Sequence, residues 1–161
     1  MTDNRLREKY TVAALFHTIA EGVEFDRGHW PAHVTLVSNF VTDADLADLV
    51  AAVRGADALT GPLAVEFAGS ALFGPDRDVP VQLVRPTRLA LTHERLADRI
   101  ESLSGFAADV PAYWRNGYRP HVTLFPGLAV SEGAQRVVQC VVIARLSGTA
   151  ATVVAAFEVP D

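Results

Sequence analysis

The sequence predicts an α+β fold for a single domain that spans residues 1–161. Half of the 161 residues are apolar, which is enough for a chain of this length to bury a core. Short apolar stretches of strand length, some in hairpin-like pairs, alternate with segments of helical periodicity, and this mixture indicates α+β. The tetrapeptide His-Val-Thr-Leu occurs at residues 33–36 and again at residues 121–124. A tandem duplication would build two lobes that share a cleft.

The first predicted elements are a buried strand over residues 10–16, a loop over residues 17–31 and a motif strand over residues 32–38. The loop is inferred from its two glycines and its proline. A helix is expected to begin at Thr42, whose hydroxyl can cap it, and to end at Gly55. Its apolar residues recur at helical spacing: Leu46, Leu49, Val50 and Val53.

The middle of the chain is predicted to form two strands, a turn and a helix. One strand follows the Gly-Pro pair at residues 61–62, a turn occupies residues 74–78, and residues 79–84 form the next strand. A helix over residues 88–103 has one apolar face, made of Leu89, Leu96, Ile100 and Leu103, and Gly105 ends it.

The last elements begin with a loop over residues 107–118 that is rich in aromatic and basic groups. The second motif strand is expected over residues 119–125, ended by a Pro-Gly pair. We expect a third helix over residues 132–146, capped by Ser131, and a final strand over residues 150–159.

Both motifs place an imidazole and a hydroxyl on one face of a strand, because successive side chains point to opposite faces. His33 and Thr35 share a face, and Val34 and Leu36 anchor the other. The second motif repeats this division: His121 and Thr123 share a face opposite Val122 and Leu124. Two such units that meet across a cleft would supply two titratable imidazoles and two hydroxyl donors.

This equipment suits metal-free acid–base chemistry on a phosphate ester. An ordinary histidine titrates near neutral pH, so a neutral imidazole can deprotonate an attacking water while a charged one protonates the departing oxygen. The threonine hydroxyls can donate to phosphate oxygens as negative charge builds there. Such a pair predicts a bell-shaped dependence of rate on pH, but the sequence does not assign base and acid between His33 and His121.

The paired motifs, one in each half of a chain of this length, resemble the 2H phosphoesterase superfamily. Its members include RNA 2',3'-cyclic phosphodiesterases, historically called 2'-5' RNA ligases. The resemblance implies two pseudo-symmetric lobes of antiparallel sheet and helices around a central cleft. It also implies that His33 and His121 are catalytic, that Thr35 and Thr123 bind phosphate, and that no metal or cofactor takes part.

The activity that the resemblance implies is hydrolysis of a ribose 2',3'-cyclic phosphodiester to a 2'-phosphate, with 2'-5' RNA ligation as the reverse reaction. Several RNA-processing relatives place an arginine shortly after the second motif. Here no basic residue follows Leu124 until Arg136. An RNA end, a small cyclic nucleotide and an ADP-ribose cyclic phosphate all remain candidate substrates.

Four residues near the second motif are candidate substrate contacts: Trp114, Arg115, Tyr118 and Arg119. Aromatic rings can stack on a nucleobase, and arginines can bind a phosphate. Tyr113, and more weakly Phe73, are further candidates for stacking. The alternative is that these aromatic residues cover the core.

The other histidines and the cysteine are expected to be structural. His93 lies on the apolar face of its helix, so we expect it to pack in the core. His29 precedes His33 by four residues, but Pro31 removes the helical geometry that a zinc site would need. Cys140 lies in an apolar run and is expected to be a buried thiol.

The net charge of −5 argues against a grip on long nucleic acid but allows a nucleotide or an RNA terminus. We expect a monomer that does not enter a membrane, and the lone cysteine suits a reducing cytoplasm. Two other classes stay open. One is a non-catalytic module that binds nucleotides or RNA ends in the same cleft, and the other is a metal-dependent phosphoesterase, for which no carboxylate–histidine cluster stands out.

Overall fold

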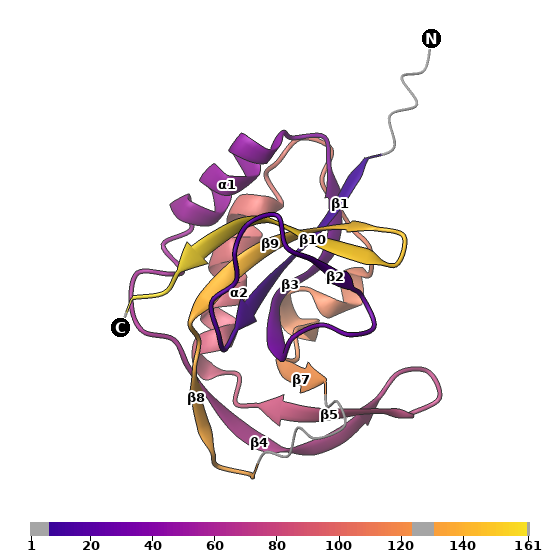
Figure 1. Cartoon of the computed structure of the whole chain (residues 1–161), viewed down its shortest axis with the longest axis vertical. Coiled ribbons are helices and arrows are strands. Elements are labelled where there is room, and N and C mark those ends of the chain that lie inside the picture. Colours follow the sequence, from indigo (N-terminus) through magenta and orange to yellow (C-terminus); the bar gives the residue numbers. More distant parts are fainter. Residues whose placement is uncertain (1–6, 124–130, 161) are drawn as a thin grey trace.

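The computed structural model describes residues 7–123 and 131–160, which form two antiparallel sheets and two α-helices (Figure 1). The larger sheet has the strand order β2-β10-β9-β1-β3-β6. Its strands are β1 (Glu8–Leu15), β2 (Glu24–Asp26), β3 (His33–Thr42), β6 (Ala107–Ala108), β9 (Cys140–Ser147) and β10 (Ala150–Glu158). The smaller sheet has the order β7-β5-β4-β8. Its strands are β4 (Ala64–Phe73), β5 (Val79–Val84), β7 (His121–Thr123) and β8 (Gln135–Val137).

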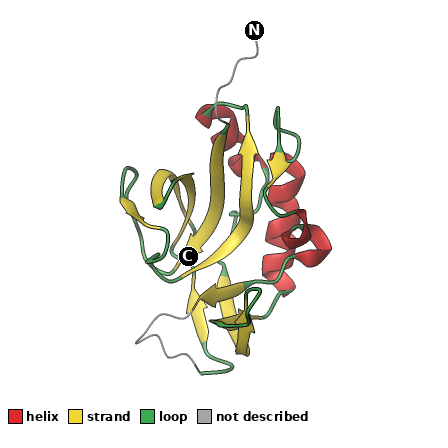
Figure 2. Cartoon of the chain, turned by 90° about the vertical axis from the view of Figure 1, so that its right-hand side faces the viewer, coloured by secondary structure: helices red, strands yellow, loops and turns green. Residues whose placement is uncertain are grey.

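Both helices, α1 (Leu46–Gly55) and α2 (Thr87–Ile100), lie on the same side of the larger sheet (Figure 2). The apolar stripe of each helix meets the apolar face of β1, β3 and β9 in one core cluster. Leu49 of α1, Leu96 of α2 and Leu36 of β3 are fully buried there. No helix in the described part of the chain is long and apolar enough to cross a membrane.

The opposite face of the larger sheet carries a smaller cluster that includes Leu15, Cys140 and Val153, covered by Phe25 and Trp30. The two motif strands lie where the sheets approach each other. β7 is an edge strand of the smaller sheet and pairs with β5, with His121 opposite Leu83. β3 contacts β7 across the gap between the sheets.

β3 is bulged at Leu36, the last residue of the first motif. β1 pairs Ala13 with Thr35 and Val12 with Val37, so Leu36 has no partner residue on β1. A second shift follows before Phe40. A bulge bends and twists a strand, and bulges are common beside active sites because they redirect side chains.

The expected α+β class and the two lobes are confirmed, as are the strands at residues 10–16 and 79–84 and the helix at residues 88–103, within a few residues. The lobes are not successive halves of the chain, because β9 and β10 return to the larger sheet. The end of the second motif strand, including Leu124, lies outside the described residues. The loops at residues 17–31 and 107–118 contain the short strands β2 and β6, which the sequence analysis missed. The second loop also holds two 3-10 turns, η1 (Pro111–Tyr113) and η2 (Arg115–Gly117).

The predicted helix over residues 132–146 is wrong, and Ser131 is not a helix cap: the segment forms β8 and β9. Cys140 to Ala144 are all buried, because helices cover one face of β9 and the smaller cluster covers the other. A strand buried on both faces has a continuous apolar run, which periodicity alone does not distinguish from a buried helix.

The predicted cap of the first helix is also wrong. β3 extends to Thr42, and the N-cap is Asp45, whose carboxylate accepts a hydrogen bond from the amide of Asp48 at 2.9 Å. The Thr42 hydroxyl instead donates to the Ser104 carbonyl at 2.8 Å and accepts from the amide of Ala44.

Candidate active site

The polar residues of the two motifs line adjoining cavities between the sheets. Val34, Leu36 and Val122 are buried behind them, as strand alternation predicts. A cavity of about 310 Å³ is lined by His33, Thr35 and Thr123, together with Thr11, Arg27, Gly28, Trp30, Asn39 and Leu146. A second cavity of about 660 Å³ is lined by His121 and also by Thr35 and Asn39. Both cavities share Thr35 and Asn39, so they adjoin, and we call them together the cleft, which all four motif side chains line.

Both motif histidines are held by the same local bond. His33 Nδ1 lies 2.8 Å from the carbonyl of Pro31, and His121 Nδ1 lies 2.8 Å from the carbonyl of Arg119. A carbonyl only accepts, so Nδ1 carries the hydrogen in each ring. Nε2 is therefore the nitrogen that can take up or release a proton.

The surroundings shift both imidazoles toward the neutral form. Burial lowers the pKa of His33, the bond to Pro31 offsets part of this shift, and a positive charge on His121 lowers that pKa further. Burial likewise lowers the pKa of His121, the bond to the Arg119 carbonyl raises it, and the Arg119 guanidinium lowers it. Because the two rings repel when both are charged, a state with one neutral and one charged imidazole is favoured over the doubly charged state.

Each motif histidine also packs against an aromatic ring. The Trp30 ring centroid is 4.6 Å from that of His33, and the Phe73 centroid is 4.6 Å from that of His121. The Arg119 guanidinium lies over Phe73, 4.8 Å from the ring centroid. These contacts restrict the orientation of both imidazoles.

Tyr118 and Arg119 line the larger cavity, as their predicted role requires. The Tyr118 hydroxyl donates to the carbonyl of Thr35 at 2.8 Å, and burial raises its pKa well above the ordinary value, so it stays a neutral donor. Tyr118 therefore also supports the backbone of the first motif. Arg119 is exposed at the rim of the cleft.

Trp114 and Arg115 line neither cavity, which corrects their prediction as substrate contacts. Trp114 is 6% exposed and packs against Phe40 and Phe106, so it covers the core, as the alternative had it. The Arg115 guanidinium is bound by three carboxylates of or next to α2: Glu94, Asp98 and Glu101.

Sequence reasoning missed several residues that line the cleft: Thr11, Arg27, Ser38, Asn39 and Arg77. Asn39 carries a usable signal, because asparagine is depleted in strands, and here it stands half-buried in β3 a few residues after the motif. Arg27 and Arg77 come from loops whose approach to the cleft depends on the tertiary fold. Tyr113, the further stacking candidate, and Phe73, the weaker one, both line the larger cavity.

The structural assignments of His93 and Cys140 are confirmed, because both are buried, and burial raises the pKa of the Cys140 thiol. His29 is exposed and lies 3.4 Å from the Asp26 carboxylate. Residues 7–123 and 131–160 contain no group of three or more His, Cys, Asp or Glu side chains placed to hold a metal ion.

Comparison with known proteins agrees with this architecture. A sequence model of the 2'-5' RNA ligase superfamily matches residues 11–152. A crystal structure described as a phosphoesterase matches with a TM-score of 0.59 at 13% identity, over 97% of this chain and 100% of the other. TT0787 of Thermus thermophilus matches with a TM-score of 0.61 at 18% identity, over 94% and 97%. E. coli LigT in complex with 3'-AMP matches with a TM-score of 0.55 at 12% identity, over 97% and 100%. No curated protein matches this chain.

Proposed function

The chain belongs to the 2'-5' RNA ligase superfamily, and from this membership and the geometry of the cleft we propose that it hydrolyses a ribose 2',3'-cyclic phosphodiester without a metal ion. The observation that carries the proposal is the meeting of two matched H-x-T units at one cleft. In both units the Nδ1 atom bonds to the carbonyl two residues earlier, and Nε2 is left to exchange protons.

In the proposed reaction, the neutral Nε2 of one motif histidine takes a proton from a water molecule as its oxygen attacks phosphorus. The bond from phosphorus to the ribose 3' oxygen breaks, and the imidazolium of the other histidine gives its proton to that oxygen. The product is a 2'-phosphate with a free 3' hydroxyl. The hydroxyls of Thr35 and Thr123 donate to the non-bridging oxygens, where charge builds in the transition state.

The larger cavity supports a nucleoside as the group that carries the cyclic phosphate. Phe73 and Tyr113 offer aromatic rings there, and Arg77 and Arg119 offer positive charge. Structures of E. coli LigT with 3'-AMP, ATP and NADP+ also support a nucleotide ligand. The candidate substrates are a small cyclic nucleotide, an ADP-ribose cyclic phosphate and an RNA terminus, and the net charge of −5 disfavours contact with long nucleic acid.

Phosphorus NMR in the presence of EDTA tests this function with the four 2',3'-cyclic nucleotides, an RNA oligonucleotide ending in a cyclic phosphate, and ADP-ribose cyclic phosphate. We expect conversion of at least one of them to a single 2'-phosphate. His33→Ala and His121→Ala should each abolish it, whereas His17→Ala, which removes an exposed imidazole away from the cleft, should not.

Unchanged turnover in both motif variants would refute the two-histidine mechanism. Activity that EDTA removes and a divalent metal restores would favour the metal-dependent class. Saturable binding of these ligands without any product would favour a non-catalytic binding module.

A further inference from the structure

Three consecutive carbonyls of the bulged part of β3 accept hydrogen bonds from side chains. The Tyr118 hydroxyl donates to Thr35 at 2.8 Å, His93 Nδ1 lies 2.8 Å from the carbonyl of Leu36, and the Thr11 hydroxyl donates to Val37 at 2.9 Å. A bulge interrupts the regular ladder with the neighbouring strand, and buried carbonyls need partners. The backbone that carries the Thr35 hydroxyl is therefore held by side chains from β1, α2 and the segment before β7.

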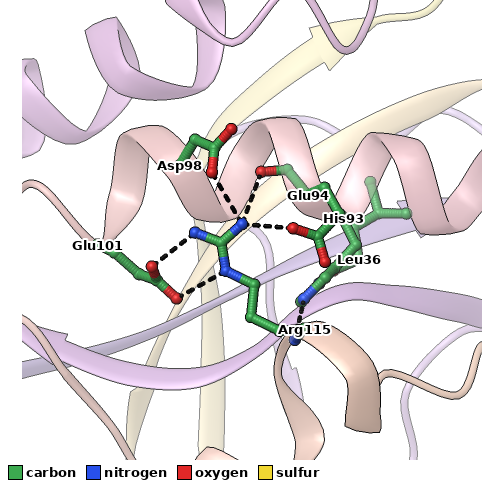
Figure 3. A network of polar contacts seen from close by, with 6 residues as sticks. All are labelled: Leu36, His93, Glu94, Asp98, Glu101 and Arg115. Atoms are coloured by element: carbon green, nitrogen blue, oxygen red, sulfur yellow. Dashed lines mark hydrogen bonds and ion pairs between the residues drawn. The ribbon is translucent and has the colours of Figure 1, made fainter.

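His93 is the fully buried member of this set, and both of its ring nitrogens are used. Nδ1 faces the Leu36 carbonyl, and Nε2 accepts a hydrogen bond from the Arg115 amide at 2.9 Å (Figure 3). A carbonyl on one side and an N–H group on the other are satisfied only by the neutral ring with its hydrogen on Nδ1. The imidazole thus joins β3 to the segment that contains Arg115.

Arg115 is anchored strongly on α2. Its guanidinium binds Asp98 at 2.8 Å and Glu101 at 2.6 Å and also pairs with Glu94 (Figure 3). Its backbone φ is +61°, a left-handed conformation that costs energy for a residue with a side chain. The three ion pairs and the bond to His93 hold this conformation in place, so the Arg115 amide is a fixed partner for the ring.

The same ring also contacts the approach to the second motif. Tyr118 stacks face to face on His93, with centroids 4.2 Å apart and planes 5° apart, and its hydroxyl reaches Thr35. Tyr118 lies three residues before His121. His93 therefore touches residues adjoining both motifs, although it lines neither cavity.

We propose that His93 is a positioning residue of the cleft: it joins the β3 bulge to residues 114–118 and so sets the Thr35 hydroxyl relative to His121. This role rests on the proposed function, in which Thr35 binds the reacting phosphate. Displacing a phosphate-binding group such as the Thr35 hydroxyl by about 1 Å can lower turnover by about 10²-fold. Loss of the His93 contacts that hold the β3 bulge should therefore have a measurable effect on the reaction.

Three variants test the proposal. His93→Phe keeps a flat ring for Tyr118 but removes both hydrogen bonds, and His93→Gln can supply one donor and one acceptor. Thr92→Val is the matched control, because Thr92 is the neighbouring buried polar residue of α2 and its hydroxyl bonds only within the helix, to the Arg88 carbonyl. Two quantities are measured. One is kcat/KM for the best cyclic phosphate, and the other is the affinity for inorganic phosphate, obtained from a titration that monitors the NMR signal of the Thr35 amide.

We expect His93→Phe to lower kcat/KM by about 10- to 100-fold and to weaken phosphate binding, at a temperature where circular dichroism shows it folded. His93→Gln should recover most of the loss, and Thr92→Val should keep wild-type values. Wild-type kcat/KM and phosphate affinity in folded His93→Phe would overturn the proposal, as would an equal loss in Thr92→Val. If the wild type opens no cyclic phosphate, the proposed function fails, but the phosphate titration still tests His93 because it needs no turnover.

Discussion

At the scale of single residues, both motif histidines make the same hydrogen bond, from Nδ1 to the backbone carbonyl two residues earlier. Strand alternation in the sequence already placed each imidazole beside a threonine hydroxyl. Strand alternation did not reveal how the surroundings of the two imidazoles differ. Besides burial, the Arg119 guanidinium lowers the pKa of His121, whereas a positive charge on His121 lowers the pKa of His33. These differences allow the proposed base and acid roles to be assigned by experiment.

Arg119→Gln should identify the role of His121. Both motif histidines have lowered pKa values, so the bell-shaped profile of kcat/KM should lie on the acid side of that for ordinary imidazoles. Removing the Arg119 charge raises the pKa of His121 and moves only its limb of the profile to higher pH. A moving acid limb makes His121 the base, and a moving alkaline limb makes it the acid. The exposed-residue control Arg88→Gln should move neither limb, and an unmoved profile in Arg119→Gln would contradict the assignment.

The hydroxyls of the two motifs can be tested separately. Thr35→Val and Thr123→Val keep the β-branched shape of the strand residue but remove the donor, so each should lower kcat/KM by about 10²-fold in steady-state assays. Thr35→Ser and Thr123→Ser keep the donor and serve as controls. Full activity in both valine variants would exclude the hydroxyls from phosphate stabilisation.

At the scale of elements, local pattern predicted the edges of α2 and β5 well and failed where the tertiary environment determines the type of structure. The run from Val137 to Ile143 is apolar at nearly every position, so its period carried no information. From Cys140 on, this run forms β9, because it pairs with β1 on one side and with β10 on the other. The bulge in β3 was equally hidden, because it depends on the register against β1.

The start of α1 gives a prediction at this scale. Asp45→Ala removes the carboxylate that accepts from the Asp48 amide and should lower the free energy of unfolding by about 1 kcal/mol, measured by urea denaturation. Asp45→Ser can still cap the helix and should recover most of this loss. An unchanged free energy in Asp45→Ala would mean that another group caps the helix.

At the scale of the whole molecule, the cleft exists because β3 of the larger sheet and β7 at the edge of the smaller sheet, far apart in sequence, come into contact. The C-terminal strands β9 and β10 complete the larger sheet beside β1 and so support the strand next to the first motif. As a result both catalytic candidates are partly buried and His93 is fully buried, which couples the stability of the fold to their protonation.

Stability should therefore fall as the pH drops. Burial lowers the native pKa values of His33, His93 and His121 below the ordinary value of about 6.5, which the unfolded chain retains. Between the ordinary and the lowered values the unfolded state binds more protons, so the stability present above about pH 6.5 is lost as the pH falls through this window.

The His93 share of this loss is separable. Burial is the largest effect and lowers the pKa of His93, and the bond to the Leu36 carbonyl of β3 raises it. Glu94 of α2 and Glu101 directly after α2 also raise this pKa, and Arg115 of η2 lowers it. Urea denaturation of His93→Gln should show a smaller decrease in the free energy of unfolding between about pH 7.5 and about pH 5 than the wild type. An equal decrease would mean that His93 does not titrate differently in the native and unfolded states.

Local sequence patterns were sufficient to identify the motif residues, the face that each one takes on its strand, and the amphipathic helix that carries His93. These features depend on the two-residue period of strands and the 3.6-residue period of helices, which are local. Only long-range contacts explain why residues 135–137 and 140–147 form strands, why Trp114 and Arg115 face the core and α2, and why three side chains hold the β3 bulge. Each of these features depends on contacts between residues distant in sequence, and such contacts produce no periodic pattern of apolar residues from which they could be predicted.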